Sequence, residues 1–394
     1  MKLNKEKLKN ASFSERIKIR IVFGFLKFNT IAIRFFSFLF FRKNLPESPK
    51  KILIYRWGSI GDCICAMPAI YDIKKRYPNA ILDIENNCPG ASVSFMEQLL
   101  HPDFYRKVIN SGNMSRSEYF KMLKTEEYDA YFMLLGSKYL LLPILKRMFF
   151  IRLAGIKYVF GQEANFVPFF RKAQSKYVDF QSVTENLKKA LSELKIPVSK
   201  QNQYPLNIQK ADEKFVNEQI DRNVENRVKS VNNNKKNIAL SIGGSADYKK
   251  WPIKNYQIIA NFLKPNFNLF IIGGKDDFEA ASQLKNVINL CGKLTLIQSA
   301  VLMKNCLLTI SNDTGPMHLS YAVGTPVIGL FSNWDFPKTW HPPEDNLNVA
   351  LRAENIPCTV CLKEKCPYDN MCIKQIEVSE VKAEIELLLR KLSN

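Results

Sequence analysis

A carboxylate stands in a glycine-bearing turn near the start of the chain. Asp62 ends the segment Arg56-Trp57-Gly58-Ser59-Ile60-Gly61-Asp62, which follows the apolar run 51–55. Gly58 and Gly61 allow a tight turn and a close approach to a ligand. A carboxylate there can accept a proton from a bound hydroxyl as a general base. It can equally act as the N-cap of the helix expected over 63–77, and these residues alone leave both interpretations open.

A second polar turn lies in the other half of the chain. Asp313, Thr314, Gly315 and Pro316 separate a strand expected over 307–310 from a helix expected over 317–323. Pro suits the first turn of a helix, where its missing N–H costs nothing. Free backbone N–H groups and the positive end of the helix dipole favour a phosphate at such a point. The alternative is an ordinary strand-to-helix connection that binds nothing.

A third loop, 243–252, follows the strand expected over 238–242. It contains Gly243, Gly244 and the hydroxyl of Ser245, together with Lys249 and Lys250. The carboxyl ends of parallel strands meet at one sheet edge, where ligands bind in open α/β sheets. Two loops suited to phosphate at one edge indicate a diphosphate ligand.

Alternating strands and helices must position these loops. Between 237 and 331, strands are expected over 238–242, 269–272, 287–290, 307–310 and 327–331, with a helix between each pair. This alternation predicts a parallel sheet with right-handed crossovers, hence a Rossmann-like domain. Residues 46–205 show the same pattern less regularly, with strands over 51–55, 80–84 and 130–135. An apolar segment over 139–151 is interpreted as a core helix, the alternative being a membrane-facing patch.

Length and composition limit the class of protein. A chain of 394 residues with 46% hydrophobic residues is globular and long enough for two domains. Of the net charge of +20, nearly half comes from residues 1–50, which hold 12 basic and 3 acidic residues. Nine cysteines and the lack of a signal-peptide cleavage pattern indicate a reducing cytoplasm.

Residues 1–45 form an arm rich in Phe, Ile and Leu. Residues 21–41 are long enough to span a bilayer, but Lys27 and Arg34 would each cost about 2.5–3.5 kcal/mol near its centre. On a helix the cations share one stripe, with Phe and Leu opposite, which favours the interface plane of an anionic membrane. Packing on the protein itself or on another subunit is the alternative, and nucleic acid fits this Phe density less well. The residues assigned to the membrane are Arg16, Arg20, Lys27, Arg34, Phe25, Phe35 and Phe36.

The remaining segments complete the expected domain plan. The polar stretch 206–236 is expected to be a linker between domains 46–205 and 237–375. Four cysteines, Cys358, Cys361, Cys366 and Cys372, leave open a structural zinc site or a short loop packed by reduced thiols. Residues 376–394 are expected to form a helix that packs back on the first domain.

In combination, the glycine turn before Asp62, Lys249-Lys250-Trp251-Pro252, Gly273-Gly274 and the segment 311–318 resemble glycosyltransferase family 9. These are the heptosyltransferases that build the inner core of lipopolysaccharide, and the match runs in order over about 51–375. The resemblance implies a GT-B fold, an α/β class with two Rossmann-like domains facing across a cleft. It implies inverting transfer without a cofactor or metal, from an ADP-heptose-type nucleotide sugar to a lipid-linked saccharide at the cytoplasmic face of the inner membrane.

The resemblance also assigns roles. It implies that Asp62 is the catalytic base, in an acceptor loop with Gly58, Ser59 and Gly61. It places Lys249 on the donor phosphates with Ser245 beside it, and Asp313 on the donor sugar. Other donor contacts fall to Thr314, Gly315, Pro316 and Met317, and a ribose contact to one of Asp276, Asp277 and Glu279. The long arm departs from the family pattern and leaves the identity of the acceptor open. Two further hypotheses are a membrane-attached scaffold that binds nucleotide sugar without turnover, and a sugar-nucleotide epimerase, which would need acid/base groups acting on the donor alone and no membrane arm.

Overall fold

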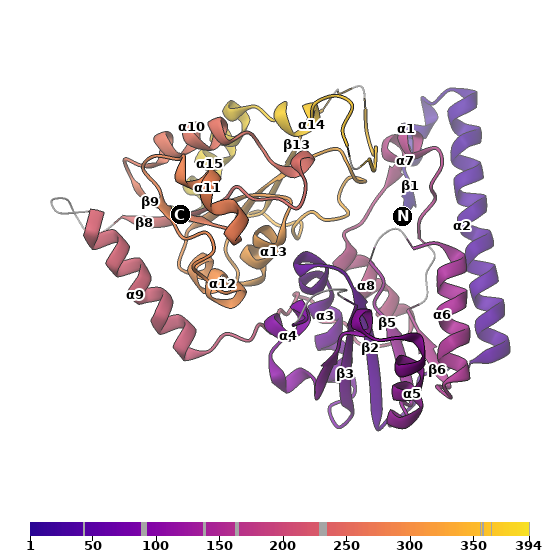
Figure 1. The fold of residues 1–394 in the computed structure, drawn as a ribbon. Coiled ribbons are helices and arrows are strands. Elements are labelled where there is room, and N and C mark those ends of the chain that lie inside the picture. Colours follow the sequence, from indigo (N-terminus) through magenta and orange to yellow (C-terminus); the bar gives the residue numbers. More distant parts are fainter. Residues whose placement is uncertain are drawn as a thin grey trace. The chain divides into compact units, whose positions relative to one another are not determined.

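The computed structural model describes residues 1–41, 44–87, 93–136, 139–161, 165–227, 235–354, 356, 358–363 and 365–393. Cys88 and residues 228–234 of the expected linker lie outside them. The chain divides into two units, Met1–Pro205 and Leu206–Asn394 (Figure 1). Each unit is built around its own parallel sheet.

Unit 1 contains a five-stranded parallel sheet in the order β4-β3-β2-β5-β6. Its central strand, β2, has five consecutive buried residues, as expected for a strand covered on both faces. Tyr55 of β2 pairs with Glu85 on one side and with Met133 on the other. The strands of unit 1 are β1 (Lys2–Leu3), β2 (Lys51–Trp57), β3 (Ile81–Asn87), β4 (Lys107–Ile109), β5 (Ala130–Met133), β6 (Tyr158–Phe160) and β7 (Val178–Asp179), of which β1 and β7 form a separate antiparallel pair.

The helices of unit 1 follow the amphipathic pattern of its sequence. The segment expected as a core helix over 139–151 is α6, with Ile144, Met148 and Ile151 buried against the sheet. The α-helices are α1 (Lys5–Lys9), α2 (Phe13–Phe40), α3 (Ile60–Arg76), α4 (Phe95–Leu99), α5 (Arg116–Glu126), α6 (Leu141–Leu153), α7 (Arg171–Tyr177) and α8 (Val183–Glu193), with 3-10 turns η1 (Pro102–Phe104) and η2 (Ser111–Asn113).

Unit 2 contains a six-stranded parallel sheet in the order β10-β9-β8-β11-β12-β13. Its strands are β8 (Lys236–Ser241), β9 (Phe267–Ile272), β10 (Ile288–Asn289), β11 (Leu308–Asn312), β12 (Val327–Phe331) and β13 (Val349–Arg352). Its helices are α9 (Lys210–Arg227), α10 (Ile253–Leu263), α11 (Phe278–Ser282), α12 (Leu296–Lys304), α13 (Gly315–Ala322), α14 (Met371–Lys374) and α15 (Val378–Ser393), with 3-10 turns η3 (Asp247–Lys249) and η4 (Lys275–Asp277). The alternation expected between 237 and 331 is present throughout.

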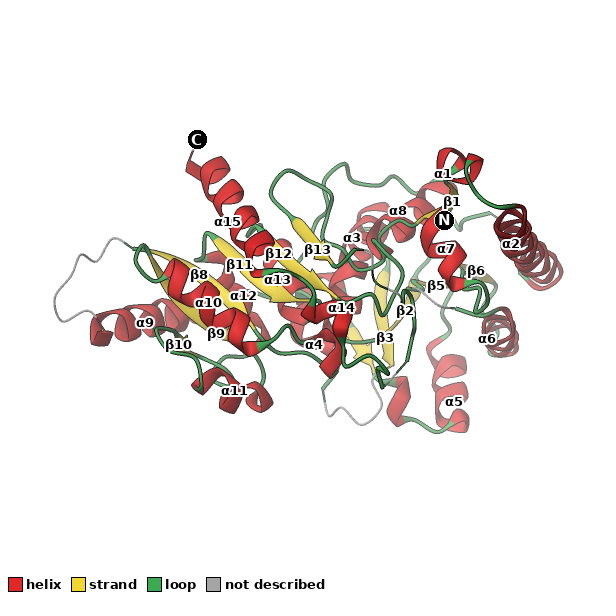
Figure 2. Cartoon of the chain, turned by 90° about the horizontal axis from the view of Figure 1, so that it is seen from above, coloured by secondary structure: helices red, strands yellow, loops and turns green. Residues whose placement is uncertain are grey.

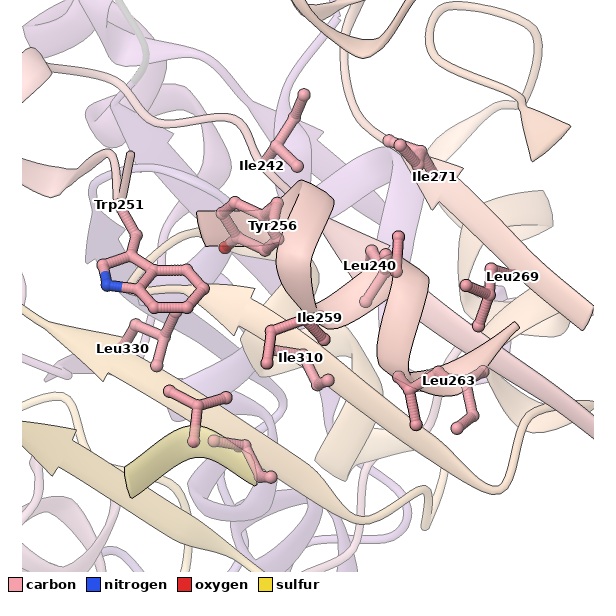
Figure 3. Close-up of a cluster of buried hydrophobic side chains, with 14 of the residues drawn as sticks. Leu240, Ile242, Trp251, Tyr256, Ile259, Leu263, Leu269, Ile271, Ile310 and Leu330 are labelled. Atoms are coloured by element: carbon pink, nitrogen blue, oxygen red, sulfur yellow. The ribbon is translucent and has the colours of Figure 1, made fainter. Parts of the chain in front are cut away.

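The core of unit 2 lies between its sheet and the helices α10 and α15. In Figure 3, Tyr256, Ile259 and Leu263 of α10 point toward aliphatic side chains of the strands, and Trp251 packs beside Tyr256. The indole N–H of Trp251 donates to the carbonyl of Ile376 at 3.0 Å, so the largest buried side chain also finds a polar partner.

Two expected segments differ from the structure. Residues 210–227 form the helix α9, where Val216 is fully buried and Glu213 pairs with Lys304 of α12 at 3.2 Å. The low apolar content of the segment hid this helix, because a single buried side chain carries little periodic signal. The C-terminal helix α15, expected to pack on the first domain, instead buries Val381, Ile385 and Leu388 in the core of unit 2.

Most of the arm is a 28-residue helix, α2, which begins with a capping box formed by Ser12 and Glu15. By length and composition α2 could cross a membrane. It lies along one side of unit 1 (Figure 2), burying Ile19, Val22, Asn29 and Ile33. A cationic stripe and one apolar face were expected for this helix. The structure instead shows an apolar face packed on the protein, a second apolar face that is exposed, and the cationic stripe between them.

The structure corrects two of the residues assigned to the membrane. Phe25 packs edge-on against Phe169, with 5.3 Å between ring centroids, and Phe36 packs against the core of unit 1. Phe35 is 64% exposed. Arg16, Arg20, Lys27 and Arg34 are exposed as expected. Helical periodicity identified the stripe, but it could not distinguish an exposed apolar face from one turned to the protein.

The packing of α15 can be tested by deleting part of one buried side chain. Ile385→Ala should lower the free energy of unfolding by about 2–5 kcal/mol, because it leaves a cavity in the core of unit 2. The measurement is urea unfolding followed by tryptophan fluorescence, since Trp251, Trp334 and Trp340 all lie in unit 2. The control Leu387→Ala, on the exposed face of the same helix, should change stability by less than about 0.5 kcal/mol. Equal effects of the two substitutions would contradict this packing.

Candidate active site

The Asp62 carboxylate lies at the start of α3, beyond the end of β2. The N-cap of α3 is Ser59, so Asp62 is the third helical residue and not the N-cap considered from the sequence. Its Oδ2 accepts hydrogen bonds from the Ser59 N–H at 3.0 Å and the Ser59 hydroxyl at 3.2 Å. The side chain remains 20% exposed. The carboxylate thus has a structural role and is still open to solvent.

Arg56 holds the other carboxylate oxygen. Its side chain has no solvent exposure, and Nη2 donates to Asp62 Oδ1 at 3.0 Å. Nε donates to the Asp62 carbonyl at 2.8 Å, and Nη1 to the Leu134 carbonyl at 2.9 Å. The sequence analysis missed Arg56. The signal was present, because a cation within a buried strand requires a partner nearby.

Gly58 makes room for this arrangement. Its φ is +128°, a conformation that side-chain-bearing residues rarely adopt, and a Cβ at this position would overlap the Asp62 carboxylate. Ser59 is exposed. In the expected acceptor loop, Gly58 leaves space for the Asp62 carboxylate and Ser59 donates hydrogen bonds to it. Gly61 is buried in the first turn of α3.

Tyr139 borders the same carboxylate. Burial raises the pKa of its hydroxyl, the positive charge of Arg56 opposes that rise and the negative charge of Asp62 adds to it. The Tyr139 N–H donates to Asn165 Oδ1 at 3.1 Å, which fixes the backbone where α6 begins. The sequence analysis did not single out Tyr139, since the contact depends on the neighbouring strands β2 and β5.

In unit 2, the Asn312 side chain holds the loop after β8 against the end of β11. It is fully buried at the end of β11, and its Nδ2 donates to the carbonyls of Ile242 at 2.8 Å and Gly243 at 2.9 Å. Its Oδ1 accepts from the Trp251 N–H at 3.1 Å and the Tyr256 hydroxyl at 3.0 Å. One amide therefore holds both ends of the 243–251 loop against β11.

The resulting arrangement brings Lys249 to Asp313. Lys249 Nζ lies 3.1 Å from both Asp313 Oδ2 and the Asp313 carbonyl oxygen. Burial by itself lowers the pKa of Lys249, but the charge and hydrogen bond of Asp313 outweigh it and raise the pKa overall. Lys249 is therefore a cation at neutral pH. The structure brings together two expected donor-binding residues that are 64 positions apart in the sequence.

The start of α13 lies directly after Asp313. Thr314 is its N-cap, but its side chain makes no capping bond to the helix and instead donates to the Asn312 carbonyl at 3.3 Å. The first N–H groups of a helix have no intrahelical acceptor, so they can bind an anion. Gly315 and Pro316 are partly exposed at this end. Met317 is fully buried, so only its backbone can take part in the expected donor contact.

The acidic residues after Gly274 have different environments. The Asp277 carboxylate accepts from the Gly274 N–H at 2.9 Å, and it fills the space that a Cβ on Gly243 or Gly273 would need. Asp276 and Glu279 are exposed, as is Ser245. Asp277 thus stabilises the turn, and Asp276 and Glu279 remain the two available carboxylates.

An aromatic pair joins the 243–251 loop to the loop after β12. The rings of Tyr248 and Trp334 are stacked with centroids 5.1 Å apart, and the indole N–H of Trp334 donates to the Lys363 carbonyl at 2.9 Å. Nearby, burial and the positive charge of Arg352 lower the pKa of His341 to about 4, so this imidazole is neutral at pH 7. The sequence analysis assigned no role to these residues, because their proximity arises from the loop after β12.

The cysteine segment lies in the same unit. Burial raises the pKa of the Cys358 thiol, and the neighbouring Cys361 and Cys366 add to the effect. Burial likewise raises the pKa of Cys372. None of these four cysteines forms a disulfide, and no group of three or more His, Cys, Asp or Glu among the described residues is arranged to hold a metal ion.

Together, these features define two chemical capacities. The start of α3 in unit 1 presents a positioned carboxylate that can accept a proton. The edge of the sheet in unit 2 presents a cation, a helix start and small loop residues, which suit a diphosphate.

Comparison with known proteins places this chain among sugar transferases. The family model for glycosyltransferase family 9 (heptosyltransferase) matches residues 116–372. Lipooligosaccharide heptosyltransferase 2 of Campylobacter jejuni is 25% identical over 359 residues, covering 86% of this chain and 98% of the relative.

Solved structures share the fold. A glycosyltransferase family 9 protein of Veillonella parvula has a TM-score of 0.66 at 17% identity, covering 88% of this chain and all of that structure. The E. coli heptosyltransferase WaaC with ADP-2-deoxy-2-fluoro heptose has a TM-score of 0.55 at 17% identity, covering 85% of this chain and 99% of that structure. Both confirm the expected α/β fold of the GT-B type. The chain belongs to glycosyltransferase family 9, the heptosyltransferases, and is a glycosyltransferase.

Proposed function

We propose that this enzyme transfers a heptose, with inversion and without a metal, from an ADP-heptose-type donor to a lipid-linked saccharide at the cytoplasmic face of the inner membrane. The observation that carries the proposal is the assembly of Lys249, Asp313 and the start of α13 at one sheet edge. A relative's structure holds an ADP-heptose analogue, and another relative acts in lipooligosaccharide synthesis. Family membership favours an enzyme over the non-catalytic scaffold.

The proposed step moves one proton and one electron pair. The acceptor hydroxyl forms a C–O bond to the anomeric carbon while the bond from that carbon to the diphosphate breaks on the opposite face. Asp62 takes the hydroxyl proton, and the electron pair of the broken bond leaves with the nucleoside diphosphate. Lys249 and the N–H groups at the start of α13 stabilise the departing charge, a task that needs donors already positioned.

A panel assay tests the reaction. Purified protein is incubated with ADP-heptose, other nucleotide sugars and a lipid-linked core acceptor, and products are identified by mass spectrometry. The proposal expects acceptor mass to increase by one heptose with the ADP donor. Transfer from a different donor alone would reject the assignment of the sugar or base, and donor isomerisation without transfer would favour an epimerase.

Asp62→Asn should reduce kcat by roughly 10²–10⁴-fold while leaving donor affinity unchanged, because the amide cannot accept the proton. Turnover and donor binding are measured separately, and the melting temperature checks the fold. Asp103→Asn, an exposed carboxyl of the same unit, is the matched control and should behave like the wild type. Near-native turnover of Asp62→Asn would reject Asp62 as the base.

Lys249→Ala should weaken donor binding as well as turnover. A hydrogen bond to a charged group contributes about 1.5–3 kcal/mol, which corresponds to roughly a 10–150-fold loss of affinity. Calorimetric titration with ADP measures the loss. The neighbouring Lys250→Ala is the control, because that lysine is exposed and pairs with Asp247 on the surface. Equal ADP affinities for the two variants would remove Lys249 from the donor site.

The membrane part of the proposal relies on the cationic stripe of α2. Arg20, Lys27 and Arg34 are exposed and form no ion pair with any described residue. Replacing all three by Glu should greatly reduce sedimentation with vesicles rich in anionic lipid, since each basic residue contributes about 1 kcal/mol near such a surface. Deleting the arm is a poorer test, because Ile19 and Val22 pack on the body of unit 1. Unchanged sedimentation of the charge-reversed variant would contradict the role of the stripe.

A further inference from the structure

The outer face of α6 carries a row of exposed apolar side chains. Leu142 is 61% exposed and Phe149 50%, and Leu153 continues the row one turn further on. Lys146 is exposed between them. The spacing of three or four residues puts these side chains on one face of the helix. Single exposed apolar residues need no explanation, but a row along a helix marks an interaction surface.

The inner face of α6 is locked to the sheet, so the helix cannot rotate to cover this row. Arg147 forms an ion pair with Glu85, whose side chain is fully buried in β3. The Arg147 guanidinium also lies 3.6 Å from the ring centroid of Tyr55 in β2. Rotation would break this pair and leave a buried charge uncompensated, which is among the most destabilising changes that a core can undergo.

The row on α6 adjoins the exposed face of α2. The two helices run side by side along one side of unit 1 (Figures 1 and 2), and Ile33 of α2 shares a core cluster with Ile144 and Met148 of α6. The outer face of α2 exposes further large side chains, namely Phe28, Ile31, Phe35 and Phe38. The two helices therefore form one apolar surface, which we call the α2–α6 face.

The α2–α6 face extends to the candidate catalytic carboxylate. Asn165 accepts from the Tyr139 N–H at 3.1 Å and donates to the Gly136 carbonyl at 2.8 Å, and a Cβ on Gly136 would lie 3.0 Å from Nη1 of Arg56, the residue that holds Asp62. Tyr139 precedes the first residue of α6 by only two positions. Leu142 is the second residue of α6. A ligand lying along α6 thus has one end close to Asp62, and the helix extends about 20 Å from there at 1.5 Å per residue.

The charges around the face indicate its occupant. Helix α6 contains no acidic residue, and Glu15, the single acidic residue of α2, accepts from the Tyr177 hydroxyl on the protein side. The exposed charges of the two helices are the cations Arg16, Arg20, Lys27, Arg34, Lys146 and Arg152. A second copy of the chain would bring like charges together, whereas an anionic leaflet complements them.

We infer that the whole α2–α6 face rests on an anionic bilayer, so that the lipid anchor of the acceptor lies along α6 while its saccharide reaches Asp62. This inference rests on the proposed transfer to a lipid-linked acceptor, and adds α6 as the element that presents that acceptor. The enzyme then works on an acceptor that never leaves the membrane.

The test uses the double variant Leu142→Glu/Phe149→Glu of the full chain. One measurement is co-sedimentation with phosphatidylglycerol vesicles. The other is turnover with the acceptor embedded in those vesicles, compared with the same saccharide freed of its lipid. Vesicle binding and turnover of the embedded acceptor should each fall at least tenfold, while turnover of the lipid-free saccharide stays within twofold of the wild type. The control Ile258→Glu/Leu387→Glu, two exposed apolar residues of unit 2, should match the wild type in all three.

Other outcomes would overturn the inference in distinguishable ways. Unchanged vesicle binding and turnover of the double variant would exclude α6 even if the charge-reversed α2 variant loses binding, and the proposed function would stand. A halved mass in sedimentation velocity without any vesicle effect would identify a second copy as the occupant. Loss of turnover with both forms of the acceptor, seen also in Leu142→Ser/Phe149→Ser, would assign α6 to the site itself rather than to the membrane.

Discussion

Both candidate loops depend on a polar side chain that is fully buried at the end of a central strand, Arg56 in β2 and Asn312 in β11. A buried polar group must be hydrogen-bonded, because leaving it unpaired costs about 1–3 kcal/mol and more when it is charged. Arg56 meets this requirement through Asp62 and Leu134, and Asn312 through the two ends of the 243–251 loop. The groups of the candidate site are thus held by bonds that folding itself requires.

At Asp62 this arrangement joins a contribution to stability with the proposed catalytic role. The same carboxylate accepts bonds from Ser59 at the start of α3 and from Arg56, while it keeps access to solvent. Asp62 thus stabilises the first turn of α3 as its third residue, not as its N-cap, and this leaves the carboxylate accessible for the proposed role as a base. Gly58 is a necessary part of the site, because a side chain there would occupy the place of the carboxylate.

The N-terminal arm shows how one helix serves two purposes. The inner face of α2 packs on the rest of unit 1. Its outer face remains apolar and bordered by cations. Burial of Ile19, Val22 and Ile33 makes α2 part of the folded unit rather than a detachable anchor. If the α2–α6 face rests on a bilayer as inferred, this packing would hold the start of α3 at a constant distance from the lipid.

The sequence by itself determined the parallel α/β class, most elements of unit 2 and the loops after β2, β8 and β11, because apolar periodicity and the positions of Gly and Pro are local properties of the chain. It also placed Lys249 and Asp313 at one edge, since parallel strands end on the same side of a sheet. Only the tertiary structure decided that Arg56 holds Asp62, that Phe25 and Phe36 face the protein, and that α15 packs in unit 2. Local periodicity identifies a polar or apolar face, but the partner of that face depends on residues that are distant in the sequence.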